Sequence, residues 1–275
     1  MLRLWGEQLS VALAPDRLVL VRGSGGLRPK LIAKAIVPVT AAETGWKPAL
    51  DTLAKTLKSD RQWQNAATSV VVSNSFVRYQ LVPWSDEINS PEERLAYVRQ
   101  SFIQVYGDTA ADWVYVVSEV ARGAAWFACA MDRDLLTQLE ETVAQAGAKL
   151  VSVAPHLMTA FNNARQAIKS KAYWFVLVEK DRLLLALMSG GHWHSVSSRQ
   201  IVGEQWQQEL PLLLEREWRI NGLGQVPREV VISAPEAHQA ALNGDGKWVF
   251  RWLRSGLRYG LEGRADALYA MALGA

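Results

Sequence analysis

The sequence predicts a mixed α/β protein built around a duplicated unit of three strands, one helix and a fourth strand. Strand and helix patterns alternate along the chain, which is typical of a mixed α/β architecture. The order β-β-β-α-β occurs twice, about 160 residues apart, and such a repeat is a strong indication of duplicated architecture. With 275 residues and 49% hydrophobic content, the chain can bury one large core or two smaller ones.

The first copy begins with a predicted hairpin. An Ala-Pro-Asp turn at 14–16 separates two short apolar runs, and the glycine-rich stretch 23–26 leads to a third strand. A helix with leucines at helical spacing and a short buried strand complete the unit. The expected strands are 8–13, 17–22, 31–39 and 68–73, and the expected helix is 46–57.

The second copy repeats this order after residue 170. Its three strands are joined by the turns 179–181 and 189–191, and a long helix precedes a Val-Val-Ile strand. The expected strands are 172–178, 182–188, 192–198 and 229–233, and the expected helix is 204–219.

An extra segment separates the two copies. Residues 76–84 alternate like a strand, and Ser90-Pro91-Glu92-Glu93 opens a helix because proline and acidic residues favour the first turn. Gly147 suits the C-terminal cap of a later helix. The expected helices are 90–105, 132–146 and 155–168, and the expected strands are 76–84, 113–120, 125–131 and 149–153.

The composition excludes several classes of protein. A net charge of +3 spread along the chain does not indicate a dedicated nucleic-acid binder, and Arg216 to Arg219 is interleaved with Glu215 and Glu217, as on a solvated helix face. One cysteine excludes an internal disulfide framework, and no apolar run is long enough to cross a bilayer. His192 and His194 would share a strand face, but they lack further ligands, so we expect no metal site.

Three stretches carry a resemblance to a known family. Residues 69–74 running into 76–84, the helix-glycine-strand stretch 144–154 and residues 265–274, which look like a closing helix, are similar to parts of the PilM, MshI and GspL-like branch of the actin-like (FtsA-like) ATPases. The resemblance implies an actin-like α/β fold, with two ribonuclease H-like lobes and an inserted β-α-β-β module in the first. The lobes would then be residues 1–169, with the module at about 76–147, and residues 170–275.

The chain departs from that family where nucleotide is held. Actin-like ATPases carry two hairpins with an aspartate and glycines, which let backbone N–H groups approach phosphate. Here Asp16 follows Pro15, and Glu179 and Asp181 flank a lysine, with no glycine in either turn. We therefore expect no ATP hydrolysis, no cofactor and no metal, with Asp16, Glu179 and Asp181 as degenerate positions.

The resemblance implies a cytoplasmic adaptor of an MSHA-like type IV pilus or a type II secretion assembly, held peripherally at the inner membrane by a PilN-like bitopic protein. An assembly ATPase of the same machine is a further possible partner. In that branch the partner's tail lies in a groove between the first lobe and the inserted module. The resemblance therefore points to Arg78, Tyr79, Val82, Pro83 and Trp84 as partner-binding residues.

Other interpretations stay open at this point. Val82 and Trp84 fit equally well as core residues of a strand. The twelve tryptophans exceed what small cores easily hide, so we expect a few to line a partner's groove. An active ATP-binding protein with divergent phosphate loops is the main functional alternative, and a duplicated enzyme related to sugar kinases is a weaker one.

Overall fold

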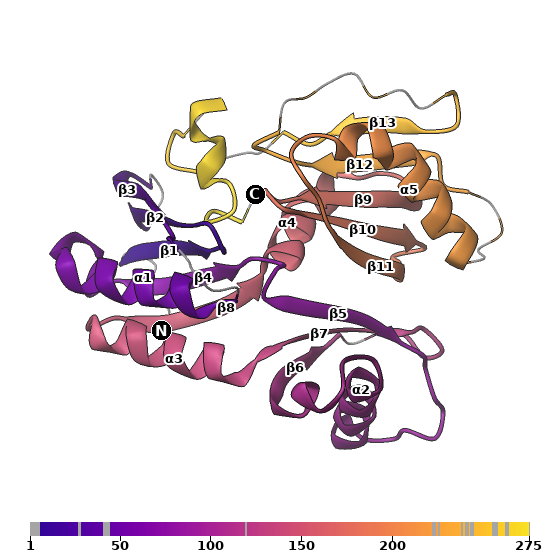
Figure 1. Ribbon diagram of the computed structural model, residues 1–275, viewed down its shortest axis with the longest axis horizontal. Coiled ribbons are helices and arrows are strands. Elements are labelled where there is room, and N and C mark those ends of the chain that lie inside the picture. Colours follow the sequence, from indigo (N-terminus) through magenta and orange to yellow (C-terminus); the bar gives the residue numbers. More distant parts are fainter. Residues whose placement is uncertain are drawn as a thin grey trace. The chain divides into compact units, whose positions relative to one another are not determined.

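The computed structural model describes residues 6–26, 29–40, 45–118, 120–221, 224, 226–237, 239, 242, 245–254, 258–261 and 264–274 (Figure 1). Packing divides them into two compact units. The first contains the described residues up to Val77, the segment Asp132–Arg165 and the described residues from 258 onward. The second contains Arg78–Met131 and the described residues from Gln166 to Arg254. This grouping reports packing, whereas the predicted lobe boundaries describe the duplicated topology.

A five-stranded sheet forms the centre of the first unit. Strands β1 and β2 form an antiparallel hairpin, and β4 returns after helix α1 to pair parallel with β1. The order across the sheet is β3-β2-β1-β4-β8. Its strands are β1 (Glu7–Leu13), β2 (Arg17–Ser24), β3 (Leu31–Pro38), β4 (Ala67–Val72) and β8 (Lys149–Pro155).

Amphipathic helices cover one face of this sheet (Figure 1). Helix α1 (Lys47–Ser59) buries Ala49, Leu50, Leu53 and Leu57, and helix α3 (Arg133–Gln145) buries Leu135, Leu139 and Val143, each set at helical spacing. Helix α4 (His156–Ala164) follows β8 directly and continues into a short 3-10 turn at Arg165–Ala167. A second 3-10 turn, Arg61–Trp63, precedes β4.

The C-terminal segment returns to the first sheet. Met271 and Ala272 are buried against Ala12, Val19 and Val21 of β1 and β2. The closing helix expected at 265–274 is instead a 3-10 helix, Arg264–Tyr269, followed by turns. Most of the hydrogen bonds here run between residues three apart, as from the Ala270 amide to the Ala267 carbonyl, which is the 3-10 pattern. The Leu273 amide donates both to the Ala270 carbonyl, three residues back, and to the Tyr269 carbonyl, four residues back.

The second unit contains a sheet with the same topology. Its order, β11-β10-β9-β12-β13, repeats the first strand for strand, with β9 antiparallel to β10 and parallel to β12. The predicted duplication is therefore confirmed. The strands are β9 (Ala172–Val178), β10 (Arg182–Ser189), β11 (His192–Gln200), β12 (Glu229–Ser233) and β13 (Val249–Trp252). Helix α5 (Trp206–Asn221) packs on this sheet through Trp206, Leu210 and Leu214.

The predicted β-α-β-β module is also present. Its strands form a separate sheet in the order β5-β7-β6. Helix α2 buries Val98 and Phe102 against Trp126 of β7, and its N-terminus has a capping box in which Ser90 and Glu93 satisfy each other's backbone N–H groups. The elements are β5 (Val77–Val82), α2 (Pro91–Tyr106), the 3-10 turn Asp108–Asp112, β6 (Trp113–Val117) and β7 (Trp126–Asp132).

Candidate functional site

The two hairpins at the positions of the family's phosphate loops have matching backbone geometry. In the first, the Ala14 amide donates to the Arg17 carbonyl (3.1 Å) and the Val39 amide to the Asp16 carbonyl (2.9 Å). In the second, the Glu179 amide donates to the Arg182 carbonyl (2.8 Å) and the Ile201 amide to the Asp181 carbonyl (2.9 Å). Asp16-Arg17 and Asp181-Arg182 are thus equivalent pairs of the duplicated fold.

The residues of these hairpins differ from those of the family's phosphate loops. Pro15 has no N–H group to offer a phosphate, and neither turn contains a glycine that would let backbone approach one. The Asp16 carboxylate lies 3.7 Å from the Arg17 guanidinium, and Arg182 donates to the Ser198 hydroxyl at 3.0 Å. An arginine follows the aspartate in each hairpin, and in the first it lies close enough to the carboxylate to compete with a metal cation there.

The turn after β12, residues 233–235, corresponds by the same resemblance to the adenosine-facing turn of the actin-like family, which is usually rich in glycine, and it contains no glycine. Ser233 and Ala234 are buried with 5% and 4% of their surfaces exposed, and Pro235 follows. The strand before this turn is bonded on its outer side, where the Leu253 amide donates to the Ile232 carbonyl at 2.8 Å. All three elements thus lack the glycines with which a nucleotide loop brings backbone donors to its ligand.

The predicted partner-binding residues lie on strand β5 and directly after it. In the described part of the chain β5 pairs with β7 alone, so it is an edge strand. Arg78 and Tyr79 are half-buried and Pro83 is exposed. Val82 is fully buried in the core of the module, with 0% of its surface exposed, so it presents nothing to a partner. Pro83 also explains why β5 ends at Val82 rather than at the expected residue 84, because proline cannot donate to a sheet.

Trp84 has features of both a core residue and a surface residue. Its ring packs on Trp126, with centroids 4.9 Å apart and planes at 40°, while its Nε1 donates to the Asp86 carboxylate at 3.4 Å. Arg122 also donates to Asp86 at 2.8 Å. The hydrogen bond from Arg122 and, to a smaller extent, that from Trp84 lower the pKa of the Asp86 carboxyl group. Trp84 is therefore half-buried, with its ring fixed at the rim of the module's core.

An aromatic stack that the sequence did not reveal joins the module to the second sheet within the second unit. The Tyr79 and Phe127 ring centroids lie 5.8 Å apart, and those of Phe127 and Trp193 lie 4.4 Å apart with planes 21° from parallel. Trp193 belongs to the His-Trp-His stretch on β11. A β-bulge interrupts the alternation of that strand, since Trp193 pairs with Met188 and Ser195 pairs with Leu187, so only the tertiary structure identifies the partner of Trp193.

The expectation that His192 and His194 share a regular strand face does not hold, because His194 is the extra residue of a β-bulge opposite Leu187 and Met188. His194 Nε2 lies 3.3 Å from the Ser189 carbonyl oxygen, and His192 is exposed. Over the ranges that the structure describes, no group of three or more His, Cys, Asp or Glu side chains is placed to hold a metal ion.

Comparisons with known proteins identify the fold. No protein-family model matches the sequence, and no curated protein matches it. Solved structures do match, and they show that the chain has the actin-like ATPase fold, which confirms the predicted fold class. One is a protein of unknown function with an actin-like ATPase fold from Bacteroides thetaiotaomicron, with a TM-score of 0.55 and 9% identity over 85% of each chain.

Two further matches come from the branch that the sequence resembles. The cytoplasmic domain of EpsL, an inner-membrane component of the type II secretion system of Vibrio cholerae, matches with a TM-score of 0.62 and 15% identity, over 98% of this chain and 95% of that one. A chain of the PilM–PilN type IV pilus biogenesis complex matches with a TM-score of 0.64 and 16% identity, over 97% of this chain and 96% of that one.

Proposed function

We propose that this protein is a non-catalytic cytoplasmic adaptor of a type IV pilus or type II secretion assembly that binds the cytoplasmic tail of a PilN-like inner-membrane protein. The observation that carries the proposal is the agreement with the PilM–PilN complex over 97% of this chain and 96% of the other. Agreement over both whole chains includes the inserted module, which a simple two-lobed fold would lack.

The three nucleotide elements support a role without catalysis. The hairpins of β1–β2 and β9–β10 lack glycine, and Pro15 offers no amide where a phosphate would need one. These features support a binding role for the protein rather than the hydrolysis of ATP.

The tail-binding site in this proposal is the edge of β5 together with the residues that follow it. Extended peptides are recognised by backbone hydrogen bonds, which give affinity, together with pockets for alternate side chains, which give specificity. Arg78 and Tyr79 supply polar contacts beside that edge, and Pro83 and Trp84 supply an apolar surface at its end.

The proposal places the protein at the inner membrane through its partner. Among the residues that the structure describes, no helix has both the length and the apolar character to cross a bilayer. A PilN-like protein would supply the membrane anchor, and an assembly ATPase of the same machine is a further proposed partner.

The test is calorimetric titration of the whole chain with the cytoplasmic tail peptide of a PilN-like protein, run beside a titration with Mg-ATP. We expect heat from the tail and none from the nucleotide. A titration with the tail peptide that releases no heat of binding would refute the adaptor proposal. Micromolar binding of Mg-ATP would favour the alternative, an ATP-binding protein with divergent loops, for which the matching positions of Asp16 and Asp181 are the specific observation.

A further inference from the structure

A tyrosine of helix α2 adjoins the apolar end of the proposed tail site. The ring of Tyr97 packs edge-on against that of Trp126 on β7, with centroids 6.2 Å apart and planes at 74°. Trp84, which the proposed function places in the tail site, packs on the same ring with centroids 4.9 Å apart. Two aromatic side chains, one from α2 and one from the segment after β5, therefore meet on a single ring of the module.

The two outer rings are partly exposed and are held by buried structure. Tyr97 is 38% exposed and Trp84 is half-buried, whereas Trp126 is 1% exposed. Trp84 is held further by its hydrogen bond to Asp86, which also accepts from Arg122. Tyr and Trp side chains fixed before binding are typical anchors of protein interfaces, because they supply much contact area at a low cost in conformational entropy.

The shared ring also carries an unpaired hydrogen-bond donor. Within the part of the chain that the structure describes, Trp126 Nε1 is buried and has no hydrogen-bond partner. A buried N–H group without an acceptor is unfavourable, so an acceptor supplied by a bound molecule is favoured beside this ring. A peptide has such an acceptor in the backbone carbonyl of every residue. The three rings therefore suit a peptide that places an apolar side chain against Trp84 and Tyr97.

We propose that Tyr97 is a tail-binding residue and that, together with Trp84, it takes one aliphatic or aromatic side chain of the partner's tail. This inference rests on the proposed function, which supplies the occupant, and it adds the chemistry of one position in that occupant. A carboxylate would be repelled by the negative faces of the rings. A cation would find the Asp86 carboxylate already paired with Arg122.

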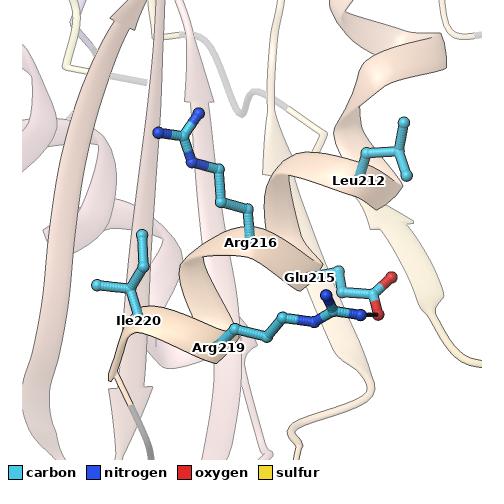
Figure 2. A pocket seen from close by; sticks show the side chains of 5 residues that line it. All are labelled: Leu212, Glu215, Arg216, Arg219 and Ile220. Atoms are coloured by element: carbon cyan, nitrogen blue, oxygen red, sulfur yellow. Dashed lines mark hydrogen bonds and ion pairs between the residues drawn. The ribbon is translucent and has the colours of Figure 1, made fainter.

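The hollow beside helix α5 has a different character. Its volume is about 350 Å³, and it is lined by Leu212, Glu215, Arg216, Arg219 and Ile220 (Figure 2). Glu215 accepts a hydrogen bond from Arg219 at 2.7 Å, and Arg216 separates the two aliphatic side chains along the helix (Figure 2). Charged groups thus interrupt its apolar surface, as on a solvated helix face.

Tyr106 provides a matched control on the same helix. It is 36% exposed, close to the 38% of Tyr97. Its ring packs on Trp113 of β6, with centroids 5.3 Å apart, and on Phe102. Because β7 lies between β6 and β5 in the sheet, Tyr106 belongs to the side of the module away from β5. A tail bound at the end of β5 should therefore not contact it.

The test is titration calorimetry of variants of the full chain with the tail peptide of a PilN-like protein. We expect Tyr97→Ala to raise the dissociation constant about tenfold or more, a loss of about 1.4 kcal/mol or more. Tyr97→Phe, which keeps the ring, and Tyr106→Ala should each change it less than about twofold. An alanine scan of the peptide should then reveal one apolar residue whose replacement weakens binding to the wild-type chain but has less effect on Tyr97→Ala, since residues in contact are not additive.

The outcomes separate this inference from the proposed function. A tail that binds the wild-type chain and Tyr97→Ala equally would overturn the role of Tyr97 and leave the adaptor proposal standing. An equal loss in Tyr106→Ala, or a coupled peptide residue that is charged, would overturn it as well. A tail that does not bind the wild-type chain refutes the adaptor proposal, and the role of Tyr97 falls with it. If circular dichroism shows that Tyr97→Ala is unfolded, Tyr97→Gln replaces it, because glutamine favours a helix and lacks the ring.

Discussion

Phe127 and Trp193 stack with their ring centroids 4.4 Å apart and their planes 21° from parallel, so a side chain of β7 contacts one of β11. The two residues are 66 positions apart in the sequence, and Tyr79 extends the stack on the other side of Phe127. This contact fixes the module to the second sheet inside the second unit.

Removing the Trp193 ring should therefore destabilise the protein. We expect Trp193→Ala to lower the free energy of unfolding by about 2 kcal/mol, because it loses both the aromatic pair and part of the buried area of a half-buried tryptophan. Urea unfolding followed by circular dichroism measures the change. Trp193→Phe keeps a stacked ring and should lose about 1 kcal/mol or less. Equal losses in the two variants would show that stacking with Phe127 contributes nothing.

Substitutions on β5 should separate the proposed tail site from the module's core. Arg78→Glu reverses a charge beside the strand edge, and Tyr79→Phe removes only a hydroxyl group. We expect the first to weaken tail binding by about tenfold and the second by less, since a single neutral hydrogen bond contributes about 1 kcal/mol. Titration calorimetry measures both. Val82→Ala is the control, because it should lower stability through a cavity and leave affinity for the tail unchanged. Wild-type affinity in Arg78→Glu would place the tail elsewhere.

Gly147 should be sensitive to any side chain. It follows α3 with φ of +68°, its amide donates to the Ala144 carbonyl, and an added Cβ would lie 2.5 Å from the Asn65 Oδ1 atom. Gly147→Ala should cost about 2 kcal/mol, from the left-handed backbone and the clash together. Gly246 has the same φ but open space around it, so Gly246→Ala should cost only about 1 kcal/mol. Chemical denaturation gives the loss in free energy of unfolding for each of the two variants, and the difference between these losses is the contribution of the clash. Identical losses would rule out a clash with Asn65.

Cys129 should resist alkylation in the folded protein. Burial raises the pKa of its thiol from 9.0 to about 11, so almost none of the reactive thiolate exists at pH 8. Iodoacetamide should label the urea-unfolded chain at least about tenfold faster than the native one, as measured by mass spectrometry.

The same pKa shift has a consequence for stability. Because the unfolded thiol ionises first, unfolding releases a proton between pH 9 and pH 11, and the thiol's contribution to stability is lost as the pH rises through that range. Cys129→Ala should remove this part of the pH dependence. Rapid labelling of the native protein would contradict the buried environment of the thiol.

Local sequence patterns predicted most of the helices and strands. The Ala-Pro-Asp turn, the Ser90 to Glu93 capping box and Gly147 each determine an element boundary by short-range chemistry, and all three lie where expected. Strand β13 was missed because four residues are too few to establish an alternating pattern. The closing segment 265–274 was expected as a helix, but the structure has a 3-10 helix, Arg264–Tyr269, followed by turns.

The candidate sites were less predictable, because they depend on contacts between distant segments. Glu217 and Arg216 look alike in the sequence, yet the register of α5 turns Glu217 toward Arg199 and Arg216 toward solvent. The burial of Val82 beside the exposed Pro83 likewise follows from how the module packs. The placement of Trp193 on Phe127 has no local signal at all.

The return of the C-terminal segment to the first sheet bears on how the protein is made. Asp266 forms its ion pair with Lys34, a residue 232 positions earlier in the chain, and Met271 completes the cluster over β1 and β2. A nascent chain emerging from the ribosome therefore exposes that apolar face while the module and the second sheet are synthesised. This face is covered only once residues 266–272 have been synthesised, and apolar surface exposed in the meantime favours aggregation.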